Sequence, residues 1–94
     1  MHSVDPWDFV AHNVTVLVRF TQSARRHRIG KARVLHVINH AEPTVVAATE
    51  DLQERLVWIG PDDRGVELEI VAIVEPDYLL VIHVMPHQFR RRTP

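Results

Sequence analysis

The residues of this chain that could do chemistry are cations, and most of them stand in one short stretch. Residues 19 to 33 contain no acid, and His27 lies among their basic side chains. Guanidinium and ammonium groups held together in this way attract phosphate, which they bind through several N–H donors at once. The pattern therefore predicts a surface for a polyanion. The cations of the stretch are Arg19, Arg25, Arg26, Arg28, Lys31 and Arg33.

A second basic group closes the chain at residues 90–92, and an acidic region separates the two groups. Residues 42–77 hold ten acids against Arg55 and Arg64, so the net charge of -1 conceals a strongly polarised molecule. A basic partner for the acidic region is a second expectation. Two simpler interpretations stay open. In one, the first basic group is the solvated side of an amphipathic helix. In the other, the terminal arginines are a frayed tail that favours anions.

The other histidines are weaker candidates. His36 and His40 stand four apart, a spacing that two zinc ligands on a helix can use. Because no cysteine or acid completes a recognisable pattern, we expect a surface pair, and we expect neither a metal nor a cofactor. His83 lies inside an apolar run, where a lone histidine is more often a hydrogen-bonded core residue than a catalyst.

Length and composition indicate one small domain. With 94 residues, 46% of them hydrophobic, the chain can build one modest core. The absence of cysteine excludes disulfides and thiolate metal sites, and the acidic N-terminus is unlike a signal peptide. No apolar run approaches the roughly 20 residues of a membrane span. We expect a cytoplasmic protein without membrane contact.

The first half of the chain predicts an arm, a strand and two helices. Residues 1–13 show no periodicity and are expected to lie on the domain as an N-terminal arm, whereas residues 14–20 alternate and favour a strand. Thr21 offers an N-cap for a short helix that ends near Ile29 and Gly30. A second helix is expected over residues 31–41, because apolar residues recur at helical spacing and Glu42-Pro43 stops it.

The second half predicts three strands, over residues 55–60, 66–74 and 78–85, separated by the turns PDDRG and EPD. Short turns make neighbouring strands antiparallel. The expected domain, residues 14–94 with a basic C-terminal tail, is an α+β fold of order β-α-α-β-β-β, with two helices packed on one face of a mainly antiparallel sheet. Trp58 is expected in the core or at an interface. The strand face expected under the helices carries Val66, Leu68, Ile70, Ala72 and Val74.

Several segments together resemble a known family. They are RRHRIGKARVLHVI, RLVWIGPDDRGVELEIVAIV, and a last strand VIHVMP leading into RRR. The chain resembles the BrnT-like branch of the RelE superfamily of toxins from bacterial toxin-antitoxin pairs, over about residues 14–92. The most specific pieces are the Arg26-His27 step and the spacing of Gly60, Arg64 and Gly65.

The resemblance implies an mRNA endoribonuclease that arrests translation and growth, works without a metal, and has RNA and a cognate antitoxin protein as partners. Such cleavage needs a group to draw the 2′-hydroxyl toward the phosphate, cations for the phosphate charge, and an acid for the leaving oxygen. The resemblance implies catalytic roles for His27, Arg64 and His83. RNA-binding roles would fall to Arg25, Arg26, Arg28, Arg90 and Arg91.

Two other functional classes remain open. A nucleic-acid-binding regulator could use the two predicted helices as a helix-turn-helix, with the strand hairpin as a wing. A non-catalytic interaction module is favoured by Met85-Pro86, which stand where the family usually carries an Arg-Lys pair. Trp7 in the arm and the open edges of a small sheet make a homodimer a further expectation.

Overall fold

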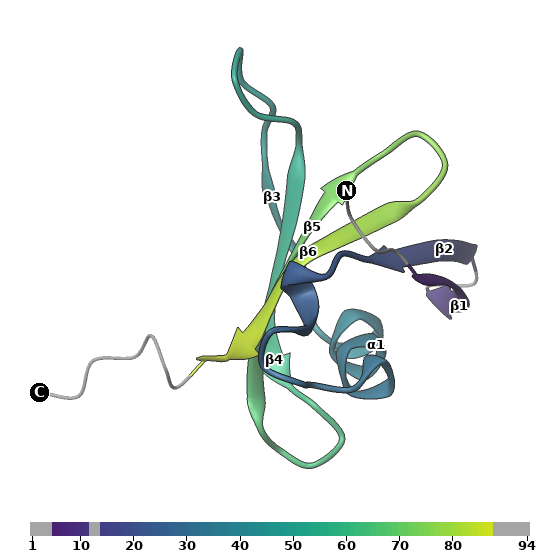
Figure 1. Ribbon diagram of the computed structural model, residues 1–94, viewed down its shortest axis with the longest axis vertical. Helices are drawn as coiled ribbons and strands as arrows, with labels where there is room; N and C mark the ends of the chain where they lie inside the picture. The colour runs from purple at the N-terminus through teal and green to yellow at the C-terminus, as the bar shows by residue number, and fades with distance from the viewer. Residues whose placement is uncertain (1–4, 12–13, 88–94) are drawn as a thin grey trace, which may run out of the picture.

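In the computed structural model of the chain, residues 5–11 and 14–87 are described, and they form one six-stranded sheet with one α-helix (Figure 1). Across the sheet the strands lie in the order β1-β2-β6-β5-β4-β3. The helical elements are the 3₁₀ turn η1 (Ser23–Arg25) and α1 (Lys31–His40). The strands are β1 (Asp5–Ala11), β2 (Val14–Phe20), β3 (Thr44–Val46), β4 (Arg55–Pro61), β5 (Glu67–Val74) and β6 (Leu79–Pro86).

The expected order β-α-α-β-β-β, with two helices on the sheet, is wrong. Only α1 is an α-helix in the described part of the chain, and the segment expected to be the first helix forms the single turn η1. The hydroxyl of Thr21 does accept a hydrogen bond from Ala24 N, as an N-cap would, but Arg28 has a left-handed backbone with φ 57, which ends the helical conformation. A segment this short, with cations and no acids, also lacks the side-chain pairs that stabilise further turns.

Two further strands enlarge the sheet beyond the expected four. β1 lies within the segment predicted as an arm and pairs antiparallel with β2 along its full length. The short β3 pairs antiparallel with β4 at the other edge. β2 pairs with β6 in parallel, while β6, β5 and β4 form the expected antiparallel meander. The sheet is therefore mixed, and its two halves join at the β2–β6 pair.

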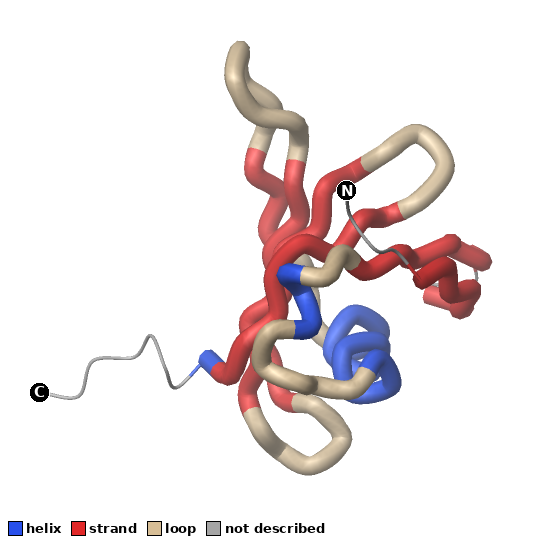
Figure 2. The backbone as a smooth tube through the Cα atoms, in the orientation of Figure 1, coloured by secondary structure: helices blue, strands red, loops and turns tan. Residues whose placement is uncertain are grey.

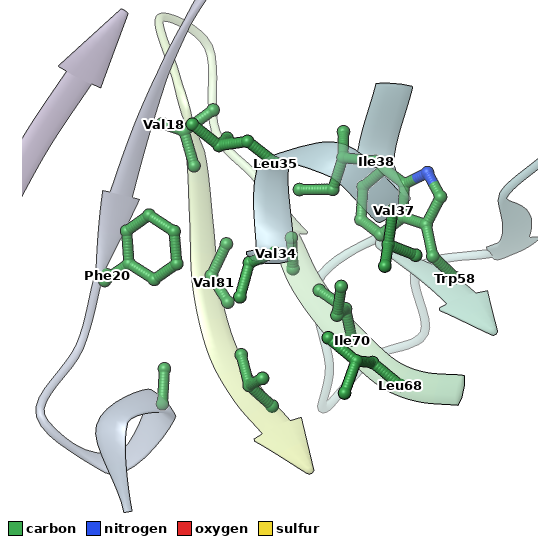
Figure 3. Close-up of a cluster of buried hydrophobic side chains, with 13 residues drawn as sticks. Val18, Phe20, Val34, Leu35, Val37, Ile38, Trp58, Leu68, Ile70 and Val81 are labelled. Atoms are coloured by element: carbon green, nitrogen blue, oxygen red, sulfur yellow. The ribbon is translucent and has the colours of Figure 1, made fainter. Parts of the chain in front are cut away.

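The hydrophobic core lies between α1 and one face of the sheet (Figure 3). The helix contributes Val34, Leu35, Val37 and Ile38, which recur at helical spacing and are buried. Of the predicted core face, Leu68, Ile70 and Ala72 are buried, as is Trp58, whereas Val66 and Val74 at its two ends are only partly buried. Each fully buried side chain of this size stabilises the fold by about 1.5–3 kcal/mol. The sheet residues of this core are Val18, Phe20, Trp58, Leu68, Ile70, Ala72, Val81 and Val84.

The opposite face of the sheet carries no helix among the described residues, and η1 and α1 lie on the same side of the central strands (Figure 2). Residues that alternate with the core positions, such as Val57, Val71 and Ile73, are partly exposed on this face.

No helix in the described ranges is long and apolar enough to cross a membrane.

Candidate nucleic-acid interface

The segment that carries the first basic group is fixed to the sheet by Thr21. Its backbone N donates to the carbonyl of Val81 in β6 over 3.0 Å, and its hydroxyl donates to the same carbonyl over 3.3 Å. Ala24 in η1 is 2% exposed and belongs to the hydrophobic core. These contacts hold η1 against β6, so the arginines that follow start from a defined position instead of a mobile loop.

The end of η1 and the loop that follows it present their cations to solvent. Arg25, Arg26 and Arg28 are exposed, whereas Ile29 packs against the core and His27 is partly buried. Arg28 donates its backbone N–H to the carbonyl of Arg25 over 2.9 Å and has φ 57. A left-handed backbone at a residue other than glycine costs free energy, and such residues concentrate at functional sites.

Lys31 begins α1 close to this loop. Its ammonium nitrogen lies 5.8 Å from the centre of the Phe20 ring, within cation–π range. Desolvation by burial lowers the pKa of Lys31, and the positive charge of Arg25 lowers it further. The two positive charges therefore repel each other, and an anion bound between them would reduce this repulsion.

The β4–β5 turn is joined to the first turn of α1 by an ion pair. Arg33 Nε donates to Asp62 Oδ2 over 2.6 Å, and the Asp62 side chain is 0% exposed. The other carboxylate oxygen, Oδ1, accepts from the backbone N–H of Arg64 at 2.8 Å and of Val66 at 2.9 Å. Gly65, with φ 82, completes the turn. This arrangement fixes the position of the turn relative to the helix.

The positive charge of Arg33 is therefore paired with a carboxylate of the protein itself. Burial by itself would raise the pKa of Asp62, but hydrogen bonds from the Val66 backbone, the Arg33 side chain and the Arg64 backbone, together with the Arg33 charge, lower it. Asp62 consequently remains a carboxylate and neutralises Arg33. The Arg64 side chain is exposed on the turn that this pair holds.

The loop and the turn lie at the same end of the molecule (Figure 1). We call this region the basic end and define it by Arg25, Arg26, His27, Arg28, Lys31 and Arg64. It unites two of the three residues predicted as catalytic, His27 and Arg64, with three of those predicted to bind RNA. What it offers chemically is a set of phosphate-binding cations together with one imidazole that can accept or donate a proton.

His83 lies elsewhere. Its neighbour Val84 is buried in the core, so the alternation of β6 places His83 on the face opposite α1, paired across the sheet with Val71. Its Nε2 is 3.9 Å from Oε1 of Glu69, and the two side chains are 37% and 8% exposed. The structure thus does not bring His83 together with His27 on one surface. Arg90 and Arg91 lie outside the described residues.

Two acids were not anticipated at these sites. The side chain of Asp62 pairs with Arg33, which is 29 positions away in the sequence. Glu69 lies on the strand face opposite α1, paired with Ile59 and Met85 of the neighbouring strands, yet it is only 6% exposed. A turn aspartate followed by Gly65 signalled the turn, but nothing local signalled the helix partner. No known protein family, curated protein or solved structure was found to match the chain.

Proposed function

We propose that the protein binds RNA phosphates at the basic end and cleaves the RNA there, as the endoribonuclease toxin of a bacterial toxin-antitoxin pair. The observation that carries the proposal is that the exposed Arg26 and Arg28 flank His27 in the sequence, in a segment that contains no acid and is fixed to β6 through Thr21. The resemblance to BrnT-like toxins of the RelE superfamily supports the specific activity. The proposal places the protein in the cytoplasm, where mRNA and a cognate antitoxin would meet it.

The proposal gives each of these residues a separate role. Arg26 and Arg28 hold the phosphate charge through guanidinium N–H donors, and Arg64 approaches from the β4–β5 turn. His27 takes the proton of the 2′-hydroxyl, whose oxygen attacks the adjacent phosphorus while the bond to the 5′-oxygen breaks. The products are a 2′,3′-cyclic phosphate and a 5′-hydroxyl, the latter protonated by solvent. Because His83 lies on the other face, it has no part in this step.

Induced expression in a bacterial host is the first test, with growth and mRNA integrity followed in parallel. The native chain should arrest growth and deplete mRNA, and coexpression of its antitoxin should relieve the arrest. The His27→Gln variant should bind RNA but lose cleavage, because it removes the proton acceptor and leaves the arginines. Normal growth with intact mRNA, at confirmed folded expression, would rule out the toxin activity.

Binding to RNA is tested separately on purified protein. The double variant Arg26→Gln/Arg28→Gln should weaken binding and reduce the slope of log affinity against log salt, by about 0.7 for each phosphate contact to single-stranded RNA that is lost. The control is Ala47→Glu/Ala48→Glu in the exposed β3–β4 loop, which changes the net charge by the same amount. Equal weakening by both variants would show that net charge, and not the basic end, governs binding.

A second candidate function is RNA binding without cleavage. It is favoured by the separation of His83 from His27, which leaves one histidine at the basic end. Its distinguishing result is salt-dependent binding at the basic end together with uncut RNA.

A further inference from the structure

The face of the sheet opposite α1 has charges of opposite sign at its two ends. Register places Arg55 opposite Ile73, Ile73 opposite Leu80, and Leu80 beside Arg19, so the two arginines lie in one row across four strands. The neighbours of both arginines pack into the core on the other side of the sheet: Leu56 on β4, and Val18 and Phe20 on β2. Alternation therefore places both arginines on the face opposite α1. This row is the cationic end of the face.

The acidic end of the same face lies toward the β4–β5 turn. Glu67 pairs with Pro61 and Glu69 with Ile59, whereas Leu68 between them is buried under α1. Six residues of β4 separate Arg55 from Pro61, which corresponds to about 20 Å along the strand. The face therefore carries cations at one end and carboxylates at the other.

Apolar side chains lie between and beside the charged groups of this face. Val57 and Val71 stand in one row with His83, Ile73 and Leu80 lie in the row of the two arginines, and Met85 pairs with Glu69. These five apolar residues are partly exposed. Ile59 is 45% exposed although it stands in the middle of a paired strand. Apolar surface rimmed by charged groups, on a sheet covered on one side only, is typical of an interaction surface.

The two arginines are also incompletely satisfied. The Nε atoms of Arg19 and Arg55 are buried and have no hydrogen-bond partner among the described residues, and neither side chain has a carboxylate partner there. The guanidinium group of Arg19 lies over the ring of Tyr78, 4.7 Å from its centre, which keeps it on the sheet surface. A carboxylate brought onto this row would supply the missing acceptors.

We propose that this face binds a second copy of the chain, face to face, about a two-fold axis that lies between the sheets and runs across the strands. Such a rotation reverses the strand direction, so the row of Arg19 and Arg55 meets the end that carries Glu67 and Glu69 of the other copy. Both pairings form at once, and the apolar residues between them, with His83 among them, pack against the other copy. The charge pattern is complementary to its own rotated image, which selects a second copy over an unrelated partner.

Sedimentation equilibrium of the full chain tests this proposal. The native protein should form a dimer. Arg55→Glu places like charges against Glu67, and Glu67→Arg places like charges against Arg55, so each variant alone should dimerise at least about tenfold more weakly. An equimolar mixture of the two variants should recover the native affinity, because the mixed dimer has opposite charges at both ends. A partner other than a second copy predicts no such recovery.

Matched controls change the same charge elsewhere. Ala47→Glu/Ala48→Glu matches Arg55→Glu in net charge, and Glu50→Arg matches Glu67→Arg, both in the exposed β3–β4 loop. These controls should dimerise as the native chain does. If a charge reversal prevents folding, Ile59→Asp at an exposed position replaces it and should give a monomer. A monomeric native protein, a dimeric Ile59→Asp variant, or no recovery in the mixture of folded variants would each overturn the proposal.

Discussion

Arg33 Nε lies 2.6 Å from Asp62 Oδ2, and this contact joins the first turn of α1 to the β4–β5 turn. The same carboxylate organises its own turn through the backbone N–H groups of Arg64 and Val66. A single buried aspartate thus contacts both the turn backbone, at Arg64 and Val66, and the first turn of the helix, at Arg33. The pair also neutralises the charge of Arg33, whose side chain is 20% exposed.

Substitution of Asp62 should destabilise the protein strongly. Asp62→Ala removes the partner of Arg33 and leaves two turn N–H groups without their acceptor, so the free energy of unfolding should fall by about 3 kcal/mol or more. Asp62→Asn keeps an acceptor for the turn and should cost about half as much. Urea denaturation measures both. Equal losses for the two variants would contradict the assignment of the turn hydrogen bonds to Oδ1.

Stability should also decline in acid because of Asp62. Its pKa is lower in the folded protein than its ordinary value of 3.8. The stabilisation is therefore complete above the unfolded-state pKa and is lost as the pH falls through the lower folded-state pKa. Urea denaturation at several pH values below about 5 should show a steeper loss for the native chain than for Asp62→Asn. Parallel pH profiles would contradict this prediction.

Two variants of Arg28 can separate the effect of the loop conformation from the effect of the positive charge. Asparagine tolerates a left-handed backbone, so Arg28→Asn should leave stability within about 0.5 kcal/mol while it weakens RNA binding. Arg28→Val removes the same charge but opposes φ 57, and should destabilise the protein by about 1–2 kcal/mol. Thermal unfolding and RNA binding of both variants provide the comparison. Equal stability of the two variants would contradict the left-handed conformation.

Gly60 controls how closely α1 approaches β4. A Cβ at this position would lie 3.0 Å from Ala41 Cβ and 3.8 Å from Val37 Cγ1. Gly60→Ala should therefore push the end of the helix outward and cost about 1–3 kcal/mol. The double variant Gly60→Ala/Ala41→Gly removes the closer contact and should recover part of the loss, as denaturant unfolding would measure. Gly65→Ala is a useful contrast, because its cost comes from φ 82 and Ala41→Gly should not relieve it.

Local sequence patterns predicted the elements whose signals are themselves local. Alternation placed the strand at residues 14–20 and the strands of the meander to within one residue at each end, and helical spacing with Glu42-Pro43 placed α1 to within one residue. The core face of β5 and the burial of Trp58 also followed from alternation. In each case one face of the element is buried, so apolar residues recur every two positions in a strand and every 3.6 positions in a helix.

The sequence by itself determined that cations gather in residues 19–33 and that one helix follows Gly30. The alternation of apolar and polar residues also determined the strand at residues 14–20 and the three strands of the meander. Only the tertiary structure decided that residues 22–28 form a single turn, that β1 and β3 extend the sheet, and that His83 lies on the opposite face from the helix. It also decided that Asp62 pairs with Arg33. The physical reason is that these features depend on strand pairing, or on contacts between residues distant in the chain, and no local spacing encodes such contacts.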